Sequence, residues 1–430
     1  MSKQKPAQVV RPQSFTGGKR YPSPDVARGF MLLLIAVANV PVWLAMFPDT
    51  AETGMLDRVW LFIRTLFVDH RAYPLFAMLF GFGLMVMVRR RQQAHVVART
   101  AELDAAYPNL PAESRNAWLR DFAEEGTLDA RRLVRRRGWW MLLFGAAHAL
   151  LFLGDIMGVY AVIAILFAGW IVGLRWRRMV VATAVLTPLV CLVLAGQQWA
   201  IATGRAPNPV ESSYHFLLGP YYPLISLVLW GFVLVVSPIA ATLIPATFLG
   251  AYLGTTDILT RPQRSRRLLR QMAVGGLTLG ALLGLPRALY IAGLWDGSQM
   301  LPVVVHELSG LLGGLGWLAT LALFVGAAKE RTARLRDVLA AVGRRSMTAY
   351  VAQSVFFALI FGLLGLSGIR SVGQATGMLI AVAVWAITVG ICQLLERSGA
   401  RGPLEVLLRR AVTRSEKPRT WPPVVGDSTQ

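Results

Sequence analysis

Two ionisable residues, His148 and Asp155, stand in an otherwise apolar stretch, residues 146–160, AAHALLFLGDIMGVY. A histidine can take and return a proton near neutral pH, and a carboxylate beside it can orient the ring. We therefore interpret His148 as a candidate general base and Asp155 as its orienting partner. The structural alternative is a neutral His148 bonded to a neighbouring helix, with Asp155 capping the next helix at its N-terminus.

The spacing of these two residues sets an expected distance. If a helix begins at Gly138, a rise of 1.5 Å per residue places His148 roughly 15 Å along it, near the middle of a bilayer. On a continuous helix Asp155 would share the same face, about 10 Å further on. That separation excludes direct contact but suits a shared polar pocket.

A second polar set lies in the first apolar run, PSPDVARGFMLLLIAVANVP. Asp25, Arg28 and Asn39 project from one helical face that leads from the membrane surface inward. We interpret Asp25 and Asn39 as candidate substrate-binding residues and Arg28 as a candidate cofactor-binding residue.

A third set opens a later run, VGRRSMTAYVAQSVF. Arg344 and Arg345 precede a helical stripe that contains Tyr350 and Gln353. Two guanidiniums below a polar stripe would suit a phosphate-bearing ligand whose tail enters the bundle, so these four residues are candidate cofactor-binding residues. Anchoring of the helix by its positive charges is the alternative for the arginines.

The turn FVDHRAYP places Asp69 and His70 before another apolar run, where they could bind substrate or simply lie in an exposed loop. No histidine, cysteine and carboxylate set has metal-ligand spacing, so we expect no metal. The GxSxG, HExxH and P-loop motifs are missing as well.

The composition of the chain indicates the type of fold that positions these side chains. The chain is 55% hydrophobic and only 16% charged, and its runs of about 20 apolar residues predict an all-α, polytopic membrane bundle. Ten such runs occur, at 29–47, 71–88, 138–153, 156–174, 179–202, 222–252, 272–294, 308–328, 346–366 and 374–394.

The basic residues indicate how this bundle is oriented. The net charge of +21 comes from short clusters between the runs, which favours cytoplasmic loops and disfavours a nucleic-acid partner. Alternation then places both termini in the cytoplasm. The predicted parts are an N-terminal tail (1–28), a transmembrane bundle (29–394) with a cytoplasmic insertion near 89–137, and a basic C-terminal tail (395–430).

Two segments depart from simple spans. Residues 55–69 carry Arg58 and Arg64 at helical spacing, which predicts an amphipathic helix along the outer interface with both arginines in contact with water. The run at 222–252 is longer than one crossing needs and contains prolines, so it predicts either one kinked helix or a broken one.

Several of these stretches together resemble the YeiB-like membrane proteins that carry the domain of unknown function 418. They are DVARGFMLLLIAVANV, YPLFAMLFGFGL, RRRGWWMLLFGAAHALLFLGDIMGVYAVIAIL, AAVGRRSMTAYVAQSVF and RGPLEVLLRRAVT. The family is grouped with transmembrane acyltransferases. In better-understood members of that wider group a catalytic histidine precedes the second span at some distance from its proline, whereas His70 lies too close to Pro74, which leaves His148 as the better-placed candidate.

The resemblance implies transfer of an acyl group from cytoplasmic acyl-CoA to an envelope glycan or lipid at the plasma membrane. Arg28, Arg344 and Arg345 would hold the CoA phosphates, and the pantetheine arm would reach His148 along Tyr350 and Gln353. The same midplane groups could instead form the binding site of a small-molecule transporter. A non-catalytic scaffold and association with further copies of the chain are also left open.

Overall fold

The computed structural model describes residues 22–206, 215, 218–240, 242–326, 330–417, 421 and 424, and their regular secondary structure is helical. The helices in chain order are α1 (Pro22–Leu44), α2 (Met55–Phe67), α3 (Ala72–Ala106), α4 (Ala112–Ala149), α5 (Met157–Val172), α6 (Trp176–Ala202), α7 (Tyr222–Ala240), α8 (Leu243–Leu253), α9 (Arg266–Ile291), α10 (Met300–Gly326), α11 (Glu330–Gly343), α12 (Ser346–Leu366), α13 (Gln374–Arg397) and α14 (Pro403–Arg414).

The all-α membrane architecture is confirmed. By length and composition the described residues contain seven helical segments able to cross a membrane, or eight if α7 and α8 together make one crossing. The ten predicted crossings and the cytoplasmic position of both termini stay predictions. The ten predicted runs exceed these seven or eight segments because α4 and α5 are not counted. Helix α5 has only 16 residues, and the apolar part of α4 continues a charged helix.

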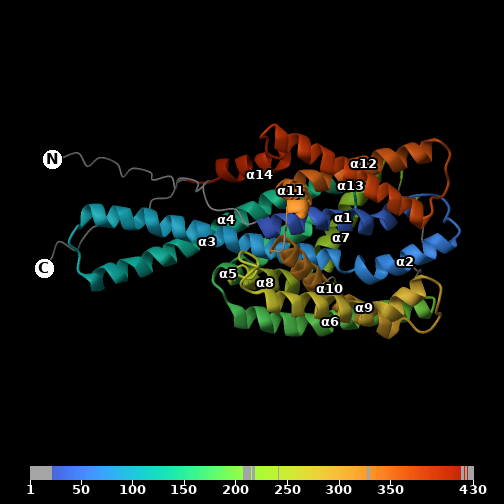
Figure 1. Cartoon of the computed structure of the whole chain (residues 1–430), viewed down its shortest axis with the longest axis horizontal. Coiled ribbons are helices and arrows are strands. Elements are labelled where there is room, and N and C mark those ends of the chain that lie inside the picture. Colours follow the sequence, from blue (N-terminus) through green and yellow to red (C-terminus); the bar gives the residue numbers. More distant parts are fainter. Residues whose placement is uncertain are drawn as a thin grey trace.

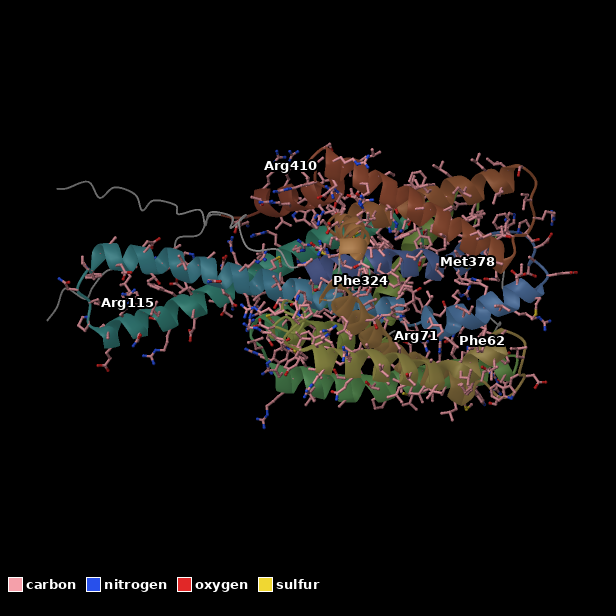
Figure 2. The ribbon with its side chains drawn as sticks, viewed as in Figure 1. Phe62, Arg71, Arg115, Phe324, Met378 and Arg410 are labelled. Atoms are coloured by element: carbon pink, nitrogen blue, oxygen red, sulfur yellow. The ribbon has the colours of Figure 1, made fainter. Side chains whose placement is uncertain are left out.

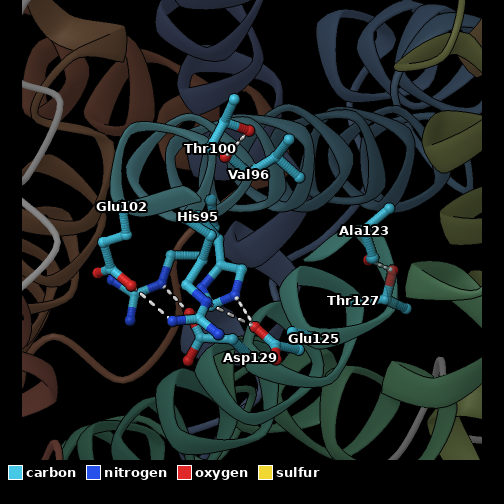
Figure 3. Close-up of polar contacts among 10 residues, drawn as sticks. His95, Val96, Thr100, Glu102, Ala123, Glu125, Thr127 and Asp129 are labelled. Carbon is cyan, nitrogen blue, oxygen red and sulfur yellow. Dashed lines mark hydrogen bonds and ion pairs between the residues drawn. The ribbon is translucent and has the colours of Figure 1, made fainter. Parts of the chain in front are cut away.

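The predicted insertion near 89–137 is a helical hairpin that projects from the bundle, formed by the extended ends of α3 and α4 (Figure 1). Polar contacts join its two arms (Figure 3). Glu125 accepts hydrogen bonds from His95 Nε2 at 3.0 Å and Arg99 Nε at 3.2 Å, and Arg91 pairs with Asp129. These bonds stabilise the hairpin in a region with few buried apolar side chains.

Close helix packing in the bundle depends on small residues, as is usual where lipid replaces water. At the crossing of α3 and α8, a Cβ added to Gly81 would lie 2.0 Å from the carbonyl oxygen of Thr247, and one added to Gly250 would lie 1.9 Å from that of Met78. These glycines allow the two backbones to touch. Next to them, α1 is buried on most faces by α3 and α10–α13.

Helix α2 confirms the amphipathic helix, but the prediction for one arginine is wrong. Arg58 is exposed, whereas Arg64 is 8% exposed and faces the bundle. Its guanidinium donates to Asp69 at 3.0 Å and to the side-chain oxygen of Gln374 at 2.9 Å. A carboxylate at the end of the helix therefore compensates the burial of this charge.

Both predicted tails contribute helical residues. The N-terminal tail, 1–28, lies outside the described residues up to residue 21, and α1 begins at Pro22. In the C-terminal tail, α14 packs against α4 and α12. Trp140 donates to Ser415 at 2.9 Å, and Glu405 accepts from the backbone N–H of Met347 at 2.7 Å, which caps α12.

The long run at 222–252 forms two helices, α7 and α8. Pro238 lies inside the last turns of α7 and lacks the N–H group that a continuous helix needs. Of the two alternatives for this run, the broken helix is the one observed.

Candidate functional site

His148 and Asp155 are in direct contact, with 2.8 Å between His148 Nδ1 and Asp155 Oδ1. The expected separation of about 10 Å is therefore wrong, since it assumed one continuous helix. Helix α4 ends at Ala149 and α5 begins at Met157. The turn between them folds Asp155 back onto the imidazole.

Asp155 accepts hydrogen bonds from three further groups, although its residue is only 1% exposed. The backbone N–H groups of Met157 and Gly158 donate at 3.2 and 2.8 Å, and Trp230 Nε1 donates at 3.1 Å. The capping and orienting roles are thus combined in one carboxylate. Because Asp155 is the acceptor, we infer that His148 Nδ1 carries the ring proton.

The other ring nitrogen of His148 meets Ser354 on α12. His148 Nε2 lies 2.9 Å from Ser354 Oγ, and both residues are buried. With the proton on Nδ1, Nε2 accepts the serine hydroxyl. The result is a series Asp155–His148–Ser354 in the order of an acid, a base and a hydroxyl nucleophile.

Two glycines allow the helices around this series to approach. A Cβ added to Gly145 would lie 2.8 Å from Asp155 Oδ2 and 2.7 Å from the nitrogen of Gly158. A Cβ added to Gly158 would lie 2.4 Å from the ring of Trp230. Neither position tolerates a side chain without displacing Asp155 or its donors.

Helix α7 supports the turn from its other side. Tyr222, Ser226 and Trp230 follow one face at spacings of four residues. Tyr222 donates to the carbonyl of Leu151 at 3.3 Å and Ser226 to that of Ala149 at 2.5 Å. This polar stripe in an apolar run is visible in the sequence, yet neither it nor Ser354 was among the predicted site residues.

A cavity of about 510 Å³ extends toward this series among α1, α3, α4, α5, α12 and α14. Four arginines line it, namely Arg28, Arg90, Arg137 and Arg344, with apolar walls from α1 and α3. From Arg344, in the turn before α12, the lining continues along the first turn of α12 through Ser346 and Met347 to Tyr350.

Tyr350 separates this cavity from the imidazole. Its ring lines the cavity and lies 4.9 Å from the His148 ring, centroid to centroid. Its hydroxyl accepts a hydrogen bond from the N–H of Ile156 at 3.3 Å. Tyr350 therefore contacts both the cavity and the imidazole.

The predicted cofactor-binding residues divide into two groups. Arg28, Arg344 and Tyr350 line the cavity. Arg345 does not, and it donates to Glu396 and to the carbonyl of Ala400, both at 2.5 Å. Arg344 also donates to Glu396, at 2.6 Å, from its place in the lining. Gln353 also lies elsewhere, and its amide donates to the carbonyl of Leu32 at 3.2 Å.

The predicted substrate-binding residues are also separated. Asp25 lines the cavity and pairs with Arg28 at 3.3 Å. Asn39 is buried on α1 without lining that cavity. Asp69 and His70 lie at the junction of α2 and α3, where Asp69 pairs with Arg64.

That junction belongs to a second polar cluster, on the side of the bundle away from the hairpin, as the labelled Arg71 shows (Figure 2). His70 pairs with Glu307 of α10. Arg71 is 1% exposed and contacts His306 Nδ1 at 2.9 Å and the carbonyl of Gly280 at 2.7 Å. The cluster joins the start of α3 to α9 and α10.

The fold and the site together define a polytopic helical membrane protein with a buried aspartate, histidine and serine in series. Residues 253–415 match the family model described as "Protein of unknown function (DUF418)", which confirms the family resemblance over this part of the chain. Ser354 and the two arginines just before α12, Arg344 and Arg345, fall inside the matched region, whereas His148 and Asp155 precede it.

One curated relative is the protein named "Uncharacterized protein YxaH" of Bacillus subtilis (strain 168), which is 30% identical over 173 residues. The matched part covers 40% of this chain and 39% of the relative, so the chain spans well under half of that protein's length. No solved structure matches the chain.

Proposed function

We propose that this protein is a plasma-membrane acyltransferase that moves an acyl group from acyl-CoA to a hydroxyl or amine of an envelope glycan or lipid. The observation that carries the proposal is the Asp155–His148–Ser354 series beside a cavity lined by arginines. A base held between a carboxylate and a hydroxyl suits acyl transfer.

The cavity lining supports acyl-CoA as the donor. Its four arginines outnumber its two acidic residues, Asp25 and Glu405. Arg137 also lies close enough to Arg28 for their like charges to repel, and a bound phosphate would relieve that repulsion. At about 510 Å³ the cavity has the size of a small-molecule site, with room for the pantetheine arm beneath a nucleotide held at the arginines.

His148 supplies the acid–base chemistry in this proposal. Asp155 fixes the proton on Nδ1, so Nε2 carries a lone pair that can accept a proton from an attacking hydroxyl or amine and return it to a leaving group such as the CoA thiolate. The thioester would reach Nε2 after Tyr350 moves aside.

The test measures thiol release from acetyl-CoA by purified protein, with envelope extract as the acceptor. His148→Ala is expected to lower turnover by about 100-fold or more while the protein stays folded. His215→Ala is the matched control, since His215 is exposed and bonds the carbonyl of Met46.

A second variant pair tests the cavity. Arg137→Gln is expected to raise the KM for acetyl-CoA by about tenfold at low salt and by less at high salt. Arg115→Gln, in an exposed ion pair on the hairpin, serves as the control. Flux of a solute into liposomes without any thiol release would contradict the proposal and support the transporter.

A further inference from the structure

We propose that Ser354 is the nucleophile, so that the acyl group passes through a covalent ester on Ser354 before it reaches the acceptor. This inference rests on the proposed acyltransferase function and adds to it a two-step mechanism. Direct transfer from the thioester to the acceptor, with His148 alone as base, is the mechanism it excludes.

The direction of the Ser354 hydroxyl is the first argument. Hydroxyls inside apolar helices usually satisfy themselves by donating to a carbonyl one turn earlier. Thr187, Thr247 and Thr320 do so here, each at 2.8 Å from the carbonyl four residues before. Ser354 instead lies 2.9 Å from His148 Nε2 across the helix interface.

The second argument is the direction of the hydrogen bond between Ser354 and His148, which runs from the serine hydroxyl to Nε2. Four N–H groups converge on Asp155, among them His148 Nδ1. With the ring proton committed to Asp155, His148 Nε2 presents a lone pair to the hydroxyl of Ser354. The arrangement therefore accepts a proton from Ser354, as activation of a serine requires.

The first half-reaction then balances within these groups. Ser354 Oγ attacks the thioester carbonyl carbon while its proton passes to His148 Nε2. The carbon–sulfur bond breaks, the CoA thiolate takes the proton from Nε2, and an ester remains on Ser354. Tyr350 lies one turn before Ser354 on the same face, so after its ring has moved aside its hydroxyl can donate to the carbonyl oxygen as charge develops there.

The second half-reaction returns the enzyme to its starting state. The hydroxyl or amine of the acceptor attacks the ester carbonyl and gives its proton to His148 Nε2. Ser354 Oγ leaves and recovers that proton. Burial of Ser354 at 2% exposure limits the access of water, which would otherwise hydrolyse the ester.

The experiment traps the ester. Purified protein is mixed with radiolabelled acetyl-CoA without acceptor, quenched in acid and digested for mass spectrometry. We expect one acetyl group on the peptide that contains Ser354, together with a burst of about one thiol per protein molecule. His148→Ala and Ser354→Ala should both lose the label.

Two further variants separate chemistry from folding. Ser354→Cys replaces one oxygen by sulfur, and its adduct should be a thioester that neutral hydroxylamine cleaves, unlike the serine ester. Ser367→Ala, at the exposed end of α12 where the hydroxyl bonds the carbonyl of Leu364, should keep the label. A labelled Ser354→Cys protein with these properties supports the mechanism even if Ser354→Ala is unstable.

Three outcomes would overturn the inference. Turnover with acceptor but no adduct, and near-normal turnover of folded Ser354→Ala, would each establish direct transfer and leave the acyltransferase function standing. An adduct on His148 would assign the nucleophile to the imidazole. Absence of thiol release even with acceptor would instead remove the proposed function itself.

Discussion

Replacing Asp155 with asparagine keeps the size and shape of the side chain but removes one of its two acceptor oxygens, and so tests whether Asp155 orients His148. The carboxylate accepts His148 Nδ1 and the Met157 N–H on Oδ1, and the Gly158 N–H and Trp230 Nε1 on Oδ2. Asparagine offers one oxygen, so its amide nitrogen must face one of these two pairs.

The two orientations differ in cost. With the amide nitrogen in place of Oδ2, the donors of Gly158 and Trp230 both lose their acceptor, at about 1–3 kcal/mol each or about 2–6 kcal/mol together. With the nitrogen in place of Oδ1, only Met157 loses its acceptor, at about 1–3 kcal/mol, because His148 can move its proton from Nδ1 to Nε2. The second orientation is therefore favoured.

That orientation predicts a folded but inactive protein. His148 Nε2 would carry a proton and point it at Ser354 Oγ, so it could no longer accept one. We expect turnover to fall by about 100-fold or more, with a loss of about 1–3 kcal/mol in the free energy of unfolding. Nitrogen NMR of labelled histidine in nanodiscs would show the proton on Nε2 in the variant and on Nδ1 in the wild type.

Asp49→Asn is the matched control, since Asp49 is an exposed carboxylate whose partner is Arg370. Two results would refute the reasoning on Asp155. One is turnover within about threefold of the wild type, well short of a general-base loss. The other is an unchanged proton position on His148 in a folded variant, which would show that Asp155 does not set the tautomer.

Three other predictions concern the packing, the charges and the span count. Gly145→Ala should lower both the melting temperature and the turnover, because its Cβ would crowd Asp155 Oδ2. Gly196→Ala should lower neither, because nothing lies within 4 Å of the added Cβ. Equal melting temperatures of the two variants would contradict this prediction. The hydrogen bond from Arg370 lowers the pKa of Asp49. The wild type should therefore have a larger free energy of unfolding than Arg370→Gln above about pH 4, and this difference should disappear as the pH falls through the lowered pKa. Cysteines placed at Leu110 and Ser367, in a chain otherwise free of cysteine, should react with impermeant reagents on opposite faces of the membrane, and labelling on one face would rule out the predicted topology.

The helical bundle could be predicted from sequence because lipid leaves the backbone few alternatives. Each predicted apolar run lies wholly or largely in a helix, and even the broken run at 222–252 follows from Pro238. The insertion near 89–137, predicted between two apolar runs, forms the extended ends of α3 and α4. The number of crossings stays a prediction, because α4 joins an apolar half to a charged half without a break and α5 is only 16 residues long.

The site was only half visible in the sequence, for a geometric reason. His148 and Asp155 stand out by their chemistry, but their distance depends on where α4 ends, and seven residues can span about 10 Å of helix or fold back to 2.8 Å. Arg344 and Arg345 show the same limit. Both lie in the turn between α11 and α12 and both donate to Glu396, but only Arg344 lines the cavity, whereas Arg345 also donates to the carbonyl of Ala400.

Ser354 is invisible to any local pattern because its meaning comes from a partner 206 positions away in the chain. A buried serine could have satisfied its hydrogen bond within its own helix, as Thr187, Thr247 and Thr320 do. Instead the bundle brings His148, Asp155 and Ser354 together. Glycines at positions 145 and 158 leave room for Asp155 and for Trp230 of α7, which donates a hydrogen bond to the carboxylate. Apolar side chains would fill this space without desolvating four polar groups, so the arrangement is better explained by a reaction that needs a proton acceptor beside the cavity than by packing alone.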